Sequence, residues 1–235
     1  MSSGWTLQNL AIVLHLLLFV YWLGSDIGVF YTSRFVTRPD LSVQARAIAV
    51  KIMDVVDMAP RICLVLFLPS GVTLMAASSY GRDIFSGWPL VVIWVAGLGW
   101  LALVFADHRR RPDRLGALVH RTDLVVRVTL VIGLLAVAGY TFAAESPFGV
   151  TTNPNWLAGK VAAYALCIAC GVAIRLRLAP FGPAWAEVVA GRSTPDVERS
   201  LERSVRGTLP FVYAIWALVV IAAVLGVVKP GSTVS

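Results

Sequence analysis

Charged residues are scarce in this chain: Asp, Glu, Lys and Arg make up 14% of its 235 residues, whereas hydrophobic residues make up 58%. A soluble globular domain has about 25% charged and about 45–50% apolar residues. The composition therefore excludes an ordinary soluble domain. Cysteine is also rare, and the three cysteines, Cys63, Cys167 and Cys170, lie within apolar segments. They give no disulfide framework of the kind found in small secreted domains.

Motifs of several enzyme classes are missing as well. The sequence contains no phosphate-binding loop, no HExxH zinc motif and no GxSxG nucleophile elbow. The first apolar segment has no Lys or Arg before it and no obvious small-residue cleavage site after it. We therefore expect this segment to be a retained helix and not a removable signal peptide.

Six apolar segments approach or exceed the roughly 20 residues that a helix needs to cross a bilayer. They cover residues 6–32, 52–78, 88–107, 123–144, 156–178 and 208–229. The sequence predicts an all-α fold, a polytopic bundle of six transmembrane helices that forms a single integral membrane domain over residues 1–235. A polar stretch follows the fifth span, in which Val197, Leu201 and Val205 repeat every four residues. This repeat predicts a short amphipathic helix on the membrane surface.

Basic residues concentrate between alternate spans. The segments after the first, third and fifth spans carry most of them: Arg34, Arg38, Arg46, Lys51, Arg109, Arg110, Arg111, Arg114, Arg121, Arg175, Arg177, Arg192, Arg199, Arg203 and Arg206. The opposite side carries only Arg82, Lys160 and Lys229. By the positive-inside rule we expect both termini outside, in a bacterial cytoplasmic (inner) membrane. The net charge of +7 then needs no nucleic acid as a partner; we expect membrane lipid instead.

The first span carries the strongest functional signal. His15, Phe19, Trp22 and Asp26 follow at spacings that place them on one face of a helix. An imidazole and a carboxylate are costly in hydrocarbon, so this face should point at protein, water or a cofactor. A neutral imidazole on a dry helix face is a good iron ligand. The alternative is a structural histidine that is hydrogen-bonded to a neighbouring helix.

Other polar residues in the spans have plainer explanations. Lys160 lies near the start of the fifth span, where its side chain could reach the outer interface. Tyr164, one turn deeper, is expected near the depth of His15, about 13 Å below the helix start. Asp54, Asp57 and Arg61 share one helix face, and we interpret them as a structural ion-pair set, with a proton path as the alternative. His120, like His108, is expected at the headgroup level.

Short motifs at the ends of four spans follow a recognisable order. His15, Trp22 and the Tyr31-x-x-Arg34-Phe35-Val36 exit open the chain, Pro60 and Gly71 occupy the second span, Trp156-x-x-x-Lys160 begins the fifth, and Arg203, Pro210 and Val228-Lys229-Pro230 frame the last. This set resembles the HemJ-type membrane haem proteins, within a broader superfamily that includes CopD-type copper-resistance proteins. The resemblance covers residues 1–78 and 156–230.

The resemblance implies a b-type haem with His15 as an axial ligand, and protoporphyrinogen oxidation with electrons passed towards quinone. It makes Lys160 a catalytic cation, with Trp22 and Arg34 as supporting residues. The enzyme assignment rests on the cofactor and the resemblance. Tyr164 is a further cofactor-binding candidate.

The chain also departs from that family. Residues 88–144 form an inserted helix pair, and Gly171 occupies the position where the family tends to carry a second histidine. The second axial ligand is therefore open: five-coordinate iron, Met75, Tyr164 and Lys160 are alternatives. Two other functions remain as alternatives. One is copper transport through His15, Met75 and the three cysteines, since soft ligands select Cu(I). The other is an anchor subunit of a respiratory complex. The protein partner expected for the chain is a second copy of itself or a larger membrane complex.

Overall fold

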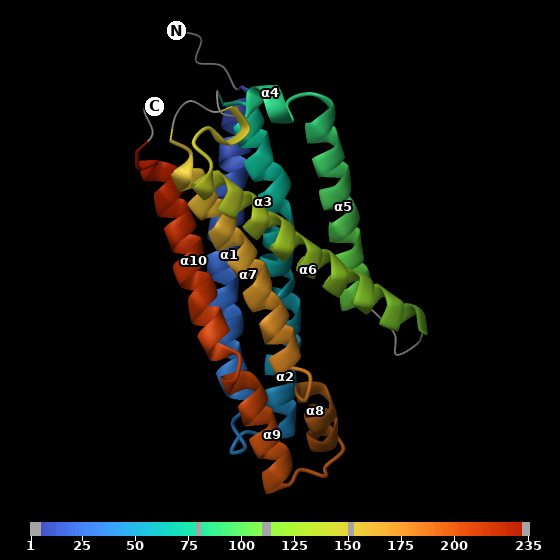
Figure 1. Cartoon of the computed structure of the whole chain (residues 1–235). Coiled ribbons are helices and arrows are strands. Elements are labelled where there is room, and N and C mark those ends of the chain that lie inside the picture. Colours follow the sequence, from blue (N-terminus) through green and yellow to red (C-terminus); the bar gives the residue numbers. More distant parts are fainter. Residues whose placement is uncertain (1–5, 79–80, 110–113, 150–152, 232–235) are drawn as a thin grey trace. The chain divides into compact units, whose positions relative to one another are not determined.

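A computed structural model describes residues 6–78, 81–109, 114–149 and 153–231 of the chain (Figure 1). Within these ranges the chain folds into helices and contains no strand. The helices are α1 Leu7–Val36, α2 Val43–Val56, α3 Met58–Ala76, α4 Arg82–Phe85, α5 Trp88–His108, α6 Arg114–Ala143, the short 3-10 helix η1 Pro147–Gly149, α7 Asn155–Arg177, α8 Phe181–Val189, α9 Pro195–Arg206 and α10 Leu209–Val228.

The described helices include six segments long and apolar enough to cross a membrane. The segments are Gln8–Val36, Val43–Ala76, Trp88–His108, Arg114–Ala143, Asn155–Arg177 and Pro195–Val228. Large apolar side chains remain exposed along them: Val20, Val95 and Val227 are 61, 66 and 82% exposed. Such exposure suits a bilayer, in which apolar groups on the protein surface carry no penalty. The all-α, six-span, multi-pass fold expected from the sequence is confirmed.

The helices extend beyond the apolar segments that identify them in the sequence. The second span begins at Val43 in the structure, nine residues before the expected position, because α2 continues as an amphipathic helix into the polar segment. The helix is interrupted at Asp57, and Pro60 lies in the first turn of α3. A proline is tolerated there because its missing N–H has no intrahelical partner at a helix start. Pro69 lies within α3 and does not end it.

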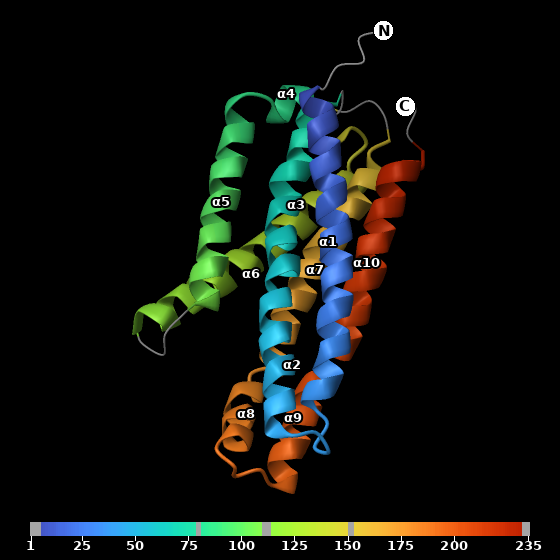
Figure 2. The same cartoon turned by 180° about the vertical axis from the view of Figure 1, so that it is seen from behind.

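The chain divides into two compact units, which are described separately. The first comprises residues 1–26 and 56–126, and the second residues 27–55 and 127–235. In the first unit α3 packs against α5, and the short helix α4 contacts both (Figure 2). The two long helices approach closely where Gly97 of α5 meets Pro69, because a Cβ atom at Gly97 would lie 3.2 Å from the proline ring. Trp94 also donates a hydrogen bond to Thr73 at 3.0 Å.

In the second unit α7 and α10 run side by side (Figures 1 and 2). Small residues permit this approach: a Cβ atom at Gly159 would lie 2.8 Å from a methyl carbon of Leu225. The end of α1 belongs to the same unit, where the ring of Phe30 contacts those of Tyr213 and Trp216 on α10.

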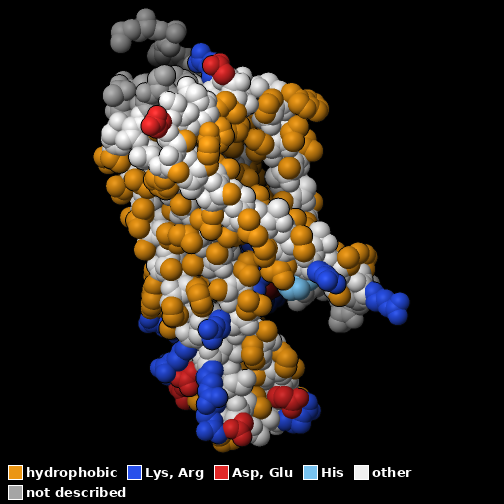
Figure 3. Space-filling model, in the orientation of Figure 1, with side chains coloured by type: hydrophobic (Ala, Val, Ile, Leu, Met, Phe, Trp, Pro, Cys, Tyr) orange, Lys and Arg blue, Asp and Glu red, His pale blue; other side chains and the backbone are white. Residues whose placement is uncertain are grey.

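The amphipathic helix predicted around Val197, Leu201 and Val205 is present as α9. At its start the Thr194 side chain accepts a hydrogen bond from the backbone of Val197 at 3.3 Å. Its apolar face, however, packs against α8, a helix that the sequence reading did not anticipate, and Leu201 is fully buried with Val188. We expected this face to lie on the bilayer. At Leu201 it packs on α8 instead. Figure 3 shows charged side chains gathered at this end of the second unit.

Candidate cofactor site

His15 lies on α1 within the first unit and is hydrogen-bonded to α3. Its Nδ1 atom is 2.8 Å from the hydroxyl oxygen of Ser70, a fully buried residue. The same hydroxyl lies 3.2 Å from the backbone carbonyl oxygen of Phe67, to which it donates. The sequence reading missed Ser70. The only signal was its position beside Gly71 in the second span.

This pair of contacts favours one position for the proton of His15. A serine hydroxyl has one proton to donate. When that proton is given to the Phe67 carbonyl, the hydroxyl accepts from an Nδ1–H group of His15. The imidazole is then the neutral tautomer with its lone pair on Nε2, the form in which histidine binds a metal ion.

Aromatic rings and a glycine surround the His15 ring. The centroids of the His15 and Phe67 rings are 4.4 Å apart. The Trp22 ring meets the same Phe67 ring edge-on, with 5.3 Å between centroids. Trp22 is 3% exposed. A Cβ atom on Gly71 would lie 3.5 Å from Cε1 of His15, so α3 presents its backbone there. His15 and Trp22 thus share one helix face, as their spacing predicts, and meet the same phenylalanine of α3.

Lys160 lies in the second unit, near the start of α7. Its side chain is half-buried and extends over α10, where a Cβ atom on Gly226 would lie 2.6 Å from the amine nitrogen. Among the described residues no carboxylate forms an ion pair with it. Its positive charge is therefore not neutralised within the described part of the second unit.

Tyr164 follows one turn later on α7, as the sequence places it. Gly171 lies further along the same helix. A Cβ atom on Gly171 would lie 4.0 Å from a guanidinium nitrogen of Arg127 on α6. Arg127 is 3% exposed. The helix α6 therefore brings a buried cation close to Gly171.

Arg34 lies at the end of α1, within the second unit. Its guanidinium group stacks over the Phe30 ring at 4.6 Å from the centroid. Both residues line a cavity of about 320 Å³ that α9 also borders, through Glu202 and Arg206. Among the predicted site residues, His15 and Trp22 therefore both contact Phe67. Lys160 and Tyr164 lie on one helix, α7. Arg34 lines a cavity that α9 borders.

The helices α5 and α6 carry polar contacts that the sequence did not predict. His120 contacts Asp107 at 3.1 Å and is not simply solvated. Trp100 donates to the carboxylate of Asp123 at 3.0 Å, and Asp123 is fully buried. The signal was present, because an acidic residue within a span marks a site that needs a partner.

Among the described residues, no group of three or more His, Cys, Asp and Glu side chains could hold a metal ion. Cys63 and Cys167 are buried, and Cys170 is half-buried. Within the described part of the chain, His15 is therefore not part of such a cluster.

Comparison of the chain with protein-family models, with curated proteins and with solved structures gives no match. The geometry of the chain itself is therefore the basis for its proposed function.

Proposed function

We propose that the chain is a membrane protein that binds haem b through His15 and passes electrons towards the quinone pool. One observation carries this proposal: the imidazole of His15 lies within a membrane span and is hydrogen-bonded at Nδ1 to the buried hydroxyl of Ser70. Ligating histidines are commonly held in this way, with one ring nitrogen on a hydrogen-bond partner and the other on the metal.

The residues around His15 fit a haem ligand. The Ser70 contact fixes the ring orientation and favours the tautomer that presents Nε2 as the ligating atom. Trp22 and Phe67 are apolar or largely apolar neighbours, and a low local polarity is one means by which a protein sets the potential of a haem. Gly71 presents no side chain towards the ring, and α3 approaches Cε1 of His15 with its backbone there.

The bound haem would supply one-electron transfer, and the chain would supply the ligand, its orientation and a dry environment. Lys160 is proposed as the functionally required cation. Since no described carboxylate pairs with it, its ammonium group can interact with an anionic group of a substrate or cofactor. Arg34 is proposed in the supporting role that the resemblance implies, and Tyr164 as a cofactor contact.

The membrane and its orientation belong to the same proposal. The distribution of arginine supports a bacterial inner membrane with both termini outside. Protoporphyrinogen is the substrate that the resemblance implies, and a quinone or another redox protein would accept the electrons.

Metal analysis of the purified protein tests this function against copper transport. We expect about one iron per chain in the wild-type protein, together with haem extractable by acidified solvent, and little copper. His15→Ala should remove most of the iron. Stoichiometric copper without iron would contradict the proposal and favour transport.

A further inference from the structure

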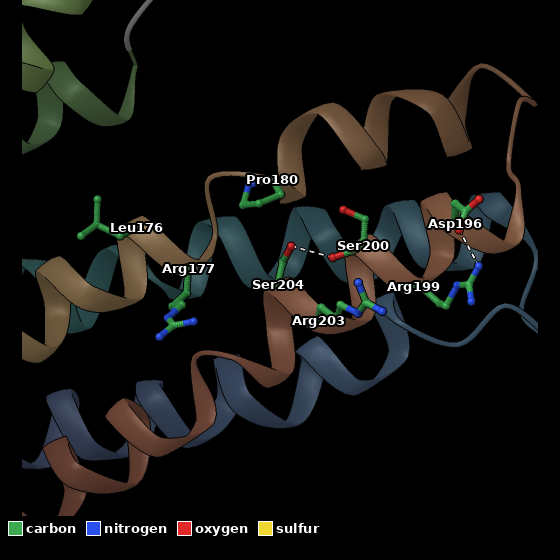
Figure 4. Close-up of a pocket in the computed structure, with 8 residues that line it drawn as sticks. All are labelled: Leu176, Arg177, Pro180, Asp196, Arg199, Ser200, Arg203 and Ser204. Carbon is green, nitrogen blue, oxygen red and sulfur yellow. Dashed lines mark hydrogen bonds and ion pairs between the residues drawn. The ribbon is translucent and has the colours of Figure 1, made fainter.

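A groove of about 540 Å³ lies where the end of α7 meets α9, entirely within the second unit (Figure 4). Three arginines line it: Arg177 is the last residue of α7, and Arg199 and Arg203 lie on α9. Asp196 is the one carboxylate in the lining. Positive charge is therefore in excess, which favours an anionic ligand.

Two of these arginines are available to a ligand. Arg199 pairs with Asp196 at 2.5 Å, and both side chains are exposed, so water screens this pair. Neither Arg177 nor Arg203 has an ion-pair partner among the residues that the structure describes. Their guanidinium groups can therefore bind an anion without first breaking an internal salt bridge.

Arg177 lies beside Gly207. A Cβ atom on Gly207, between α9 and α10, would lie 3.6 Å from Cδ of Arg177. The aliphatic part of Arg177 thus lies over a glycine, and its side chain is exposed to a ligand. The floor of the groove is polar but internally satisfied, because buried Ser204 donates to the Ser200 carbonyl at 2.7 Å.

The place of the groove in the fold indicates what kind of anion it meets. The helix α7, which is long and apolar enough to span a membrane, ends at Arg177, and the apolar helix α10 begins at Leu209. The charged groove between these ends is expected at the level of the headgroups. Leu176 borders it and is 66% exposed. A ligand with a phosphate group beside an apolar chain would meet arginine and leucine together.

We propose that this groove binds the phosphate group of an anionic phospholipid, with Arg177 and Arg203 as the principal ligands. Arginine binds phosphate through two parallel N–H donors, so it gives geometric selectivity as well as charge. Basic clusters at the membrane edge attract anionic headgroups in the same way. The inference is independent of haem binding.

Native mass spectrometry of the full-length protein released from nanodiscs of mixed phosphatidylglycerol and phosphatidylcholine tests it. We expect the wild-type protein to retain phosphatidylglycerol preferentially. The double variant R177Q/R203Q should lower this retention about 25-fold, at about 5-fold for each arginine near the membrane surface. R177K/R203K keeps the charge without the bidentate donors, so it should retain an intermediate amount and also shows that the altered protein folds.

The double variant R38Q/R192Q is the matched control. It removes the same charge from two exposed arginines of the same unit, which pair with Asp40 and Glu187 outside the groove. Its retention should equal that of the wild-type protein. Equal retention in R177Q/R203Q, or equal loss in the control, would overturn the site. Displacement of the lipid by an equal concentration of inorganic phosphate would also overturn the lipid assignment, because it would identify a site for soluble phosphate.

Discussion

Nδ1 of His15 lies 2.8 Å from the hydroxyl oxygen of Ser70, so a helix that crosses the membrane presents an oriented imidazole to its neighbour. The hydroxyl is itself held by the Phe67 carbonyl at 3.2 Å. This chain of two hydrogen bonds favours the tautomer of His15 in which Nδ1 carries the proton. This relationship connects the local structure of α3 to the proposed chemistry of α1.

Replacing Ser70 should weaken haem binding without abolishing it. Ser70→Ala removes the partner of Nδ1 but leaves the ligating imidazole, and loss of such a supporting contact typically lowers metal affinity about 10- to 100-fold. The measurement is a haem titration of the apoprotein, with Thr73→Ala on the same helix as the control. An unchanged affinity in Ser70→Ala would show that the Ser70 contact does not support a ligand.

His15→Ala should lose most of its bound haem, whereas His108→Ala and His120→Ala should retain it. Nδ1 of His15 contacts the fully buried hydroxyl of Ser70. His120 instead contacts the carboxylate of Asp107 at 3.1 Å, and its side chain is 39% exposed. The haem-to-protein ratio of the three purified variants decides the matter. Equal loss in all three would refute the assignment of His15 as the ligand.

Lys160 should be needed for turnover and not for folding. We expect Lys160→Met to lower the rate of protoporphyrinogen oxidation in membranes at least 10-fold, since removal of an electrostatic contact to a reacting group commonly costs that much or more. Gly226→Ala should have a similar direction of effect, because its Cβ atom would displace the Lys160 amine while the charge remains.

The control for this pair is Gly139→Ala on α6, where a Cβ atom would meet nothing within 4 Å. Its rate should equal that of the wild-type protein. Full activity in both Lys160→Met and Gly226→Ala would remove Lys160 from the proposed mechanism.

Arg46 and Glu198 should contribute strongly to stability. Arg46 is 2% exposed and donates to both carboxylate oxygens of Glu198, at 2.9 and 2.8 Å, and to the Val36 carbonyl at 2.9 Å. Removing one partner of a buried ion pair leaves the other charge uncompensated and costs about 3–5 kcal/mol. Because Glu198 is partly exposed, we expect Glu198→Gln to fall at the lower end of that range.

Thermal unfolding in detergent, followed by size-exclusion chromatography, measures this effect. The control is Asp40→Asn in the exposed Arg38–Asp40 pair, where water screens the interaction and the loss of stability should be small. A Glu198→Gln protein as stable as the control would show that the Arg46 contact does not hold α2 and α9 together.

The sequence predicted the fold class well because hydrophobic length determines it. Six apolar segments must become helices, since a bilayer offers no partners for backbone N–H and C=O groups. The ends of those helices were less predictable. The helix α2 begins at Val43 because it is amphipathic, and composition alone does not distinguish such a helix from a polar loop.

The candidate site was only half visible in the sequence. The spacing of His15 and Trp22 predicted a shared face, because helical periodicity is a local property. Ser70 and Phe67 were missed, since their contact with His15 joins residues more than fifty positions apart and no local rule encodes it. Arg127 beside Gly171 was missed for the same reason. The helix α8 was missed because a glycine and a proline, Gly182 and Pro183, interrupt its short pattern.

The most direct test of the central claim is an absorption spectrum of the detergent-purified protein, recorded oxidised and then reduced with dithionite. The account predicts a Soret band that shifts on reduction, with iron in the same sample at about one atom per chain, and loss of that band in His15→Ala. A wild-type protein that expresses, folds and shows no Soret band would contradict it.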